Sequence, residues 1–149
     1  MASIGKRPAK IKRNTWVFVG NRMQLALLRE AFNIINEGIA DAETVDTVVR
    51  YSLGRRWNLV GPVASADLGG LDTFYNISTY LFKDMDNGTE PSPLLAWKVQ
   101  DGNLGTKTGR GFYEWQGEDG QRIIRERDEQ LMQQLAEDAA VEDADCKSE

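Results

Sequence analysis

Asn21 is the residue of this chain best suited to chemistry. It stands at the start of a strongly predicted helix, where its amide could donate a hydrogen bond to a substrate carbonyl oxygen from a rigid position. A structural role fits the same position, since asparagine is a favoured N-cap whose side-chain oxygen accepts an orphan backbone N–H. The two roles fit one residue only if the amide is shared or reoriented.

A second candidate is the Gly-rich basic loop at residues 105–111, with the sequence GTKTGRG. It differs from the phosphate-binding Walker loop, in which a lysine directly follows the second glycine and precedes Ser or Thr. Here Lys107 precedes Thr108 and Gly109. We expect a structural loop whose glycines permit positive φ angles, and in which Lys107 or Arg110 ties down a neighbouring acid or carbonyl.

Composition limits the chemistry further. The chain has no histidine and one cysteine, Cys146. Nucleophilic catalysis of the Ser-His or Cys-His type is therefore excluded, and no carboxylate cluster has metal-ligand spacing. No Gly-x-Gly-x-x-Gly motif is present, so we expect no metal and no dinucleotide cofactor on this chain. Hydride transfer from an alcohol would need a base and a nicotinamide supplied from elsewhere.

The helix that begins at Asn21 is predicted to run to Glu37, where Gly38 ends it. Two apolar stripes lie side by side along it: Leu25, Leu28, Phe32 and Ile35 in one, and Leu27, Ala31 and Ile34 in the other. An apolar arc this wide exceeds the stripe of a surface helix. We therefore expect this helix to be covered on most sides, inside a bundle or against a second subunit.

Further helices follow in the prediction. Asp41 caps one that Gly54 ends, residues 55–58 form a loop, and Pro62 opens a short helical stretch. A third long helix begins near Leu71. Later elements are a helix from Pro93 to about residue 102, a short strand at 112–115, a turn at 118–120, and a last helix at 125–139 with a frayed acidic end at 142–149. The fold class predicted is all-α.

Charge is distributed unevenly along the 149 residues, whose net charge is −5. Residues 1–13 carry five basic and no acidic side chains, whereas residues 117–149 carry four basic and eleven acidic ones. No aromatic residues are interleaved with the basic arm, so we expect no nucleic-acid binding. The sequence lacks an apolar run of membrane-spanning length and a secretory signal, and its one cysteine allows no internal disulfide. We expect a cytoplasmic protein without membrane contact.

Three motifs together resemble the C-terminal domain of the 3-hydroxyacyl-CoA dehydrogenases: FVGNR at residues 18–22, Gly61 and Pro62 followed by Asp67, and KTGRGFY at residues 107–113. The resemblance runs from about residue 11 to residue 115. Residues 4–8 resemble the last strand of the family's Rossmann domain. At residues 16–17 the chain has Trp-Val where the family usually has a flexible pair such as Pro-Gly, which puts the interdomain approach in question.

The resemblance implies a helical bundle similar to the C-terminal-like domain of 6-phosphogluconate dehydrogenase, with a long central helix and an intertwined dimer. It implies three regions: a basic arm at 1–14 left from the last Rossmann strand and linker, the helical domain at 15–116, and a C-terminal helix with an acidic tail at 117–149.

The same resemblance implies a function. The chain would be the substrate-binding and dimerisation domain of an NAD-dependent enzyme that oxidises a 3-hydroxyacyl-CoA to the 3-ketoacyl-CoA. Asn21 would position the substrate oxygen, while a Rossmann domain on the same or a separate chain would supply NAD and the catalytic base. We expect no activity from this chain alone. Two alternatives are a stand-alone oligomerisation or regulatory module, and a parent enzyme acting on a non-CoA 3-hydroxy acid.

Overall fold

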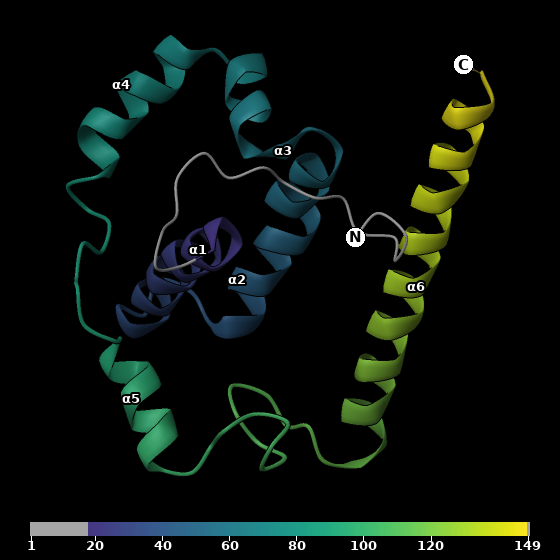
Figure 1. The fold of residues 1–149 in the computed structure, drawn as a ribbon. Coiled ribbons are helices and arrows are strands. Elements are labelled where there is room, and N and C mark those ends of the chain that lie inside the picture. Colours follow the sequence, from purple (N-terminus) through teal and green to yellow (C-terminus); the bar gives the residue numbers. More distant parts are fainter. Residues whose placement is uncertain (1–17, 149) are drawn as a thin grey trace. The chain divides into compact units, whose positions relative to one another are not determined.

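The computed structural model describes residues 18–148 of the chain, with side chains to residue 140. The regular elements of this part are helices, in the order α1 (Val19–Asn36), α2 (Ala42–Val48), η2 (Val49–Leu53), α3 (Gly54–Gly69), α4 (Leu71–Leu81), α5 (Pro93–Gln100) and α6 (Gly117–Ser148) (Figure 1). The all-α prediction is confirmed. The described residues divide into two units, 18–101 and 102–148, which are described separately below.

Helix α1 begins two residues before the predicted start. Phe18 is the extended residue that precedes the helix, and no side chain caps it. The predicted N-cap role of Asn21 is therefore wrong, because Asn21 is the third residue of the helix. Val19 and Gly20 lose no intrahelical hydrogen bond by lying in the first turn, because the first N–H groups of any helix have no intrahelical partner.

The end of α1 confirms the prediction at Gly38. Glu37 is the C-cap, and Gly38 follows it with a φ of 68°. The N–H of Gly38 donates to the carbonyl of Ile35 at 3.1 Å, and that of Ile39 donates to Ile34 at 3.0 Å. This pair of bonds is the Schellman motif, which needs a residue in the left-handed region and thus favours glycine.

Helix α2 begins as predicted, because a carboxylate oxygen of Asp41 accepts the N–H of Thr44 at 2.8 Å. Its predicted end at Gly54 and the predicted loop at 55–58 are wrong. The chain continues through one π-helical stretch, η2, directly into α3. Gly54 has helical φ and ψ, and its N–H donates to the carbonyl of Val49. A Cβ at Gly54 would lie 2.9 Å from that oxygen, so the glycine permits the π turn and does not end the helix.

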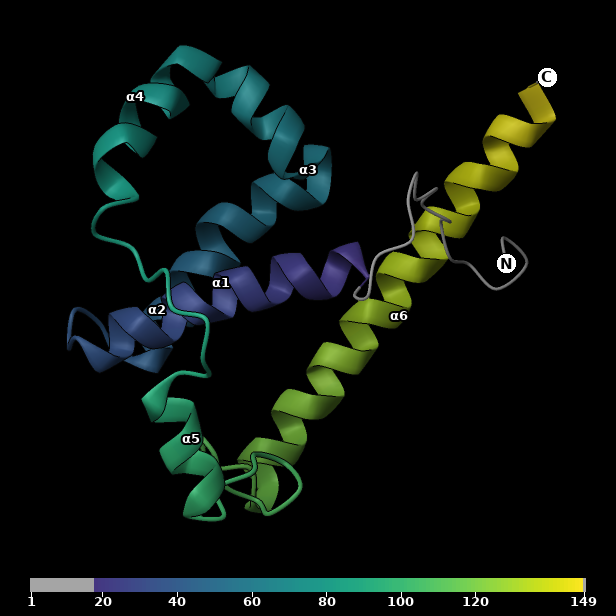
Figure 2. The ribbon, with the colours of Figure 1, turned by 60° about the vertical axis from the view of Figure 1, so that its left-hand side comes forward.

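Helix α3 is kinked at Gly61, which has a φ of 73° and a ψ of 166°. Pro62 restarts the helix there, as predicted, because its missing N–H is not needed in a first turn. Gly70, with a φ of 89°, separates α3 from α4. Figure 2 shows α4 leading away from this corner, and the only helix that α4 contacts within the described residues is α3.

The second unit departs from three predictions. Residues 112–115 form no strand; the backbone makes only the isolated bridges Gly105 to Arg110 and Arg110 to Glu114. The predicted turn at 118–120 is the first turn of α6, where Glu118 and Asp119 are favoured by the positive end of the helix. Helix α6 also runs to Ser148, so the predicted bounds of 125–139 and the frayed end at 142–148 are wrong.

The helices of the first unit leave their apolar side chains partly or largely exposed. Within the described part of the chain, no hydrophobic side chain is buried. Helix α1 contacts α2 and α5, which half-cover its C-terminal side chains, whereas Met23 and Leu25 nearer its start are at least half exposed. The covering predicted for this helix is therefore not completed within residues 18–140. None of the described helices combines the length and apolarity needed to cross a bilayer.

Candidate functional site

Asn21 lies on the first turn of α1, and its side chain is exposed. The N–H of Arg22 donates to the carbonyl of Phe18 at 3.2 Å, which closes the first turn. No acidic residue stands in that turn. The positive end of the 18-residue helix is thus not compensated by a carboxylate of its own, and negative charge near the Asn21 amide is favoured there. An amide in this place can donate to a substrate oxygen that gains charge.

The second motif lies apart from Asn21. Gly61 and Pro62 form the kink of α3, and the carbonyl of Asp67 accepts the N–H of Gly70 at 3.2 Å. Among the described elements, helix α3 contacts only its neighbours in the chain, η2 and α4, and makes no contact with α1. The first two motifs therefore do not meet within the unit. In the second motif, Gly61 and Pro62 bend α3, and Asp67 takes part in ending it.

The third motif lies in the other unit and confirms the structural prediction for the loop at 105–111. Gly105 and Gly109 have φ values of 73° and 81°. The hydroxyl of Thr108 accepts the N–H of Leu104 at 2.9 Å and donates to the carbonyl of Arg110 at 3.3 Å. Arg110 forms an ion pair with Glu114 at 2.9 Å. The loop is thus closed by its own groups, as a structural loop would be.

Close backbone approaches join this loop to the start of α6. Gly111 and Gly120 are the two buried residues of the described part. A Cβ at Gly111 would lie 2.9 Å from the Cα of Gly105, and one at Gly120 would lie 2.4 Å from the carbonyl oxygen of Trp115. The Tyr113 and Trp115 rings pack edge to face, with centroids 6.0 Å apart. Packing therefore explains the glycines at 111 and 120, whereas positive φ angles explain Gly105 and Gly109.

Sequence reasoning missed a tether between α1 and the loop after α4. A carboxylate oxygen of Glu30 accepts the backbone N–H of Asp86 at 2.9 Å, in a partly buried position. One helical position away, Arg29 donates to the carbonyl of Gly88 at 3.3 Å. The carboxylate of Asp86 accepts the N–H of Gly88 at 2.7 Å. Glu30 and Arg29 look like ordinary solvated charges in the sequence, since their partners lie far along the chain.

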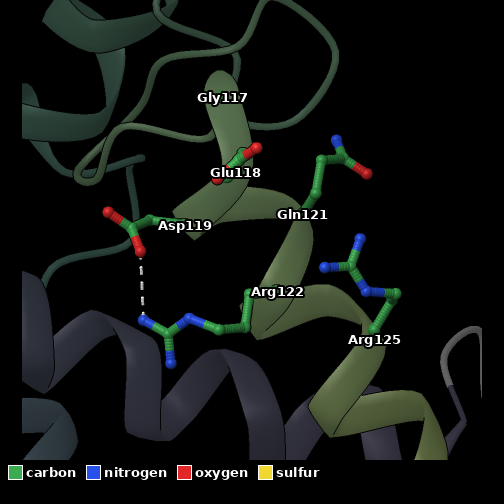
Figure 3. A pocket seen from close by; sticks show the side chains of 6 residues that line it. All are labelled: Gly117, Glu118, Asp119, Gln121, Arg122 and Arg125. Carbon is green, nitrogen blue, oxygen red and sulfur yellow. Dashed lines mark hydrogen bonds and ion pairs between the residues drawn. The ribbon is translucent and has the colours of Figure 1, made fainter.

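A surface hollow at the first turns of α6 offers no reactive centre. Figure 3 shows Arg122 reaching back to Asp119, while Gln121 and Arg125 point outward. Hydrogen bonds to Asp119 and Glu126 raise the pKa of Arg122, so its charge is fixed. The hollow is wide open to solvent, and these are i,i+3 and i,i+4 pairs on one helix surface. Across the described residues, no group of three or more acidic, Cys or His side chains is arranged to hold a metal ion.

Comparison with known families decides what kind of domain carries these features. Residues 18–115 of this chain, from Phe18 to Trp115, match the family model of the 3-hydroxyacyl-CoA dehydrogenase C-terminal domain. This chain belongs to the 3-hydroxyacyl-CoA dehydrogenase family. The match spans Asn21, the α3 kink and the loop at 105–111, so the resemblance predicted from the three motifs is confirmed.

Relatives of this 3-hydroxyacyl-CoA dehydrogenase domain include enzymes with different substrates in their names. A 5-formyl-3-hydroxy-2-methylpyridine 4-carboxylate 5-dehydrogenase from Mesorhizobium japonicum is 33% identical over 130 residues, which are 87% of this chain and 42% of the relative. A probable 3-hydroxybutyryl-CoA dehydrogenase from Bacillus subtilis is 39% identical over 100 residues, covering 66% of this chain and 34% of the relative. The chain thus spans less than half the length of these relatives.

A solved structure is also similar to this chain. The crystal structure of a 5-formyl-3-hydroxy-2-methylpyridine 4-carboxylic acid 5-dehydrogenase, described as an NAD+ dependent dismutase, matches with a TM-score of 0.82 and 32% identity. The match covers 91% of this chain and 43% of that one. The 130 residues aligned with the Mesorhizobium enzyme reach into α6 wherever the alignment begins, because only 116 residues precede that helix. Helix α6 is therefore shared in part with a relative, although the family model ends before it.

Proposed function

We propose that this chain is the substrate-facing and dimer-forming domain of an NAD-dependent dehydrogenase, and that Asn21 is its one contribution to the reacting centre. The observation that carries the proposal is the family match over residues 18–115, which includes an exposed Asn21 on the first turn of α1. A nicotinamide bound by the Rossmann domain would accept the hydride, and a base on that domain would accept the hydroxyl proton.

Asn21 acts in this proposal on the substrate oxygen. As the alcohol is oxidised, charge develops on that oxygen while its proton moves to the base. The Asn21 amide donates to it, and the positive end of α1 adds a favourable field. The chain has no histidine that could serve as the base. NAD and the base therefore belong to the partner Rossmann domain, on the same or a separate polypeptide.

The test combines this chain with a Rossmann domain of the family, fused or added separately, and follows NADH formation. We expect no turnover from the 149-residue chain alone, and turnover with the partner. Asn21→Ala should lower kcat by about 10²–10³-fold, which is the usual effect of losing one such donor. Asn36→Ala, at the other end of α1, is the matched control and should leave kcat unchanged. Equal kcat values for both variants would remove Asn21 from the mechanism.

The proposal has a rival in a different class, a stand-alone oligomerisation or regulatory module with the same fold. The same mixing experiment separates the two. A chain that neither binds nor activates any Rossmann domain of the family would favour the module.

The comparisons support two candidate substrate classes for the parent enzyme. The family model and the Bacillus subtilis relative support a 3-hydroxyacyl-CoA. A second candidate, a substrate without CoA, is supported by the Mesorhizobium relative and the solved structure, which cover 87% and 91% of this chain and are both named for a pyridine carboxylate. Parallel assays of the assembled enzyme with 3-hydroxybutyryl-CoA, free 3-hydroxybutyrate and 5-formyl-3-hydroxy-2-methylpyridine 4-carboxylate decide between them. The larger kcat/KM identifies the class.

Dimerisation is the second part of the proposal. Apolar side chains on one face of α4 stand open in the single chain: Leu71, Phe74, Ile77 and Leu81. Burying one such side chain stabilises a fold by about 1.5–3 kcal/mol, whereas ordering each residue opposes folding by about 1–2 kcal/mol. A unit without buried apolar side chains lacks the hydrophobic stabilisation that mainly offsets the loss of conformational entropy on folding. A second copy covering α1 and α4 supplies the missing core in this proposal, as in an intertwined dimer.

A further inference from the structure

A pair of arginines at the junction of α2 and α3 shares one aromatic ring. The guanidinium carbon of Arg50 lies 5.4 Å from the centroid of the Tyr51 ring, and that of Arg55 lies 4.8 Å from the same centroid. The two carbons are thus at most about 10 Å apart. All three side chains are exposed, and Tyr51 keeps 55% of its surface open to solvent.

The π turn creates this pairing. In an α-helix, residues five apart lie on different faces, because 3.6 residues complete a turn. In η2 the N–H of Gly54 reaches back five residues to the carbonyl of Val49, which widens the turn. The wider turn brings position 55 onto the same face as position 50. Such π turns inside helices often occur at functional sites.

Each guanidinium group has five N–H donors, and its contact with the Tyr51 ring leaves most of them available for other partners. Within the described part of the chain, neither Arg50 nor Arg55 forms an ion pair with a carboxylate. Arg56 is engaged differently, since it donates to the hydroxyl of Ser52 at 3.5 Å. Two like charges are therefore held within about 10 Å of each other, and an anion between them would offset their repulsion.

We propose that Arg50, Tyr51 and Arg55 form a binding site for an oxyanion of two or more negative charges, such as a phosphoryl group or a polycarboxylate. Each guanidinium donates two N–H groups to oxygens of the anion, and the Tyr51 ring fixes the spacing of the two forks. The site lies on this chain alone. It therefore goes beyond the proposed dehydrogenase function and does not require the Rossmann domain.

The test is a titration of the full chain, labelled with 15N, followed by NMR at constant ionic strength. The probes are sodium pyrophosphate, citrate and acetate, and the signals are the Arg Nε–H groups and the Tyr51 ring. We expect saturable shifts of the Arg50 and Arg55 signals with pyrophosphate or citrate, and not with acetate. Saturation with pyrophosphate alone identifies phosphoryl chemistry, and saturation with both identifies a general oxyanion site.

Variants keep the test independent of folding and of net charge. Arg50→Gln and Arg55→Gln should each weaken binding at least about tenfold, which is the usual effect of losing one bidentate contact. Arg55→Lys should weaken it similarly, because lysine keeps the charge and loses the fork. Arg125→Gln on α6 is the matched control and should bind as the native chain does. Shifts that never saturate, or an equal loss in Arg125→Gln, would overturn the proposal. Far-UV circular dichroism of each variant confirms that its helices are retained.

Discussion

Glu30 on α1 accepts the backbone N–H of Asp86 at 2.9 Å, although the two residues lie 56 positions apart in the chain. This bond fixes the segment that connects α4 to α5 against the middle of the long helix that carries Asn21. The carboxylate is partly buried here, where a charged acceptor is stronger than in water. Together with the bond from Arg29 to the carbonyl of Gly88, this side chain holds the loop at 86–88 against α1.

Removing this acceptor should loosen the loop. Glu30→Ala leaves a partly buried N–H without a partner, so we expect the free energy of unfolding to fall by about 1–3 kcal/mol. Chemical denaturation measures that loss. Amide hydrogen exchange adds a local check, because the Asp86 N–H should exchange faster in the variant. Glu37→Ala is the control, because it removes a carboxylate that lines the same surface hollow as Glu30 and Asp86. It should change neither quantity.

The close approach of α6 to Trp115 predicts a steric effect at Gly120. A Cβ there would lie 2.4 Å from the carbonyl oxygen of Trp115, and a backbone atom cannot move aside as a flexible side chain does. We expect Gly120→Ala to destabilise the unit by about 1–3 kcal/mol, a typical effect of overpacking. Thermal unfolding followed by circular dichroism measures it. Gly20→Ala introduces its Cβ where no atom lies within 4 Å, so it should leave the melting temperature unchanged or slightly higher.

The apolar face of α4 predicts the oligomeric state. Phe74→Asp places a charge on that face and should convert the proposed dimer to a monomer, or lower the dimer affinity by more than about a hundredfold. Analytical ultracentrifugation at several protein concentrations measures the association. Asn76→Asp adds the same charge on the other side of α4 and should remain dimeric. A native chain that sediments as a monomer at tens of micromolar (roughly, since weaker interfaces dissociate below that) contradicts the dimer.

The cap at Asp41 predicts a pH dependence of α2. Its pKa is lowered from 3.8, chiefly by the hydrogen bond from Thr44. A carboxylate with a lowered pKa stabilises the folded state above its ordinary pKa, and that contribution is lost as the pH falls through and below it. Asp41→Asn still caps the helix but cannot titrate. Between pH 5 and pH 2 (about the range over which such groups titrate), the native chain should therefore lose more stability than the variant, as measured by urea denaturation.

Local signals in the sequence were sufficient for several helix boundaries. Gly38, Asp41 and Pro62 each act through their own backbone or one neighbouring turn, and the structure places them as predicted. The glycines of the loop at 105–111 were also interpreted correctly, because positive φ values follow from local geometry. The family resemblance rested on the same kind of short motif, and the comparison confirms it.

The errors arise where one residue has two compatible local roles. Gly54 was predicted to end a helix, yet its missing side chain admits the Val49 carbonyl in a π turn. Asn21 was predicted to cap α1, yet an asparagine also fits the third helical position. The acids at 118–119 suggest a turn beside Gly120, although they equally suit the first turn of a helix. Packing and the neighbouring turns chose between these alternatives, and neither is visible in a short window of sequence.

By itself, the sequence determined the all-α class, the family, and the absence of a histidine base from this chain, because these depend on composition and on residues close together in the chain. Only the tertiary structure decided that α3 is the one helix in the described part of the chain that α4 contacts, that Glu30 holds the loop at Asp86, and that Arg50 and Arg55 share the ring of Tyr51. Hydrogen bonds and burial between distant segments depend on how the helices pack, and the apolar periodicity of α1 and α4 specifies which faces must be covered without specifying what covers them.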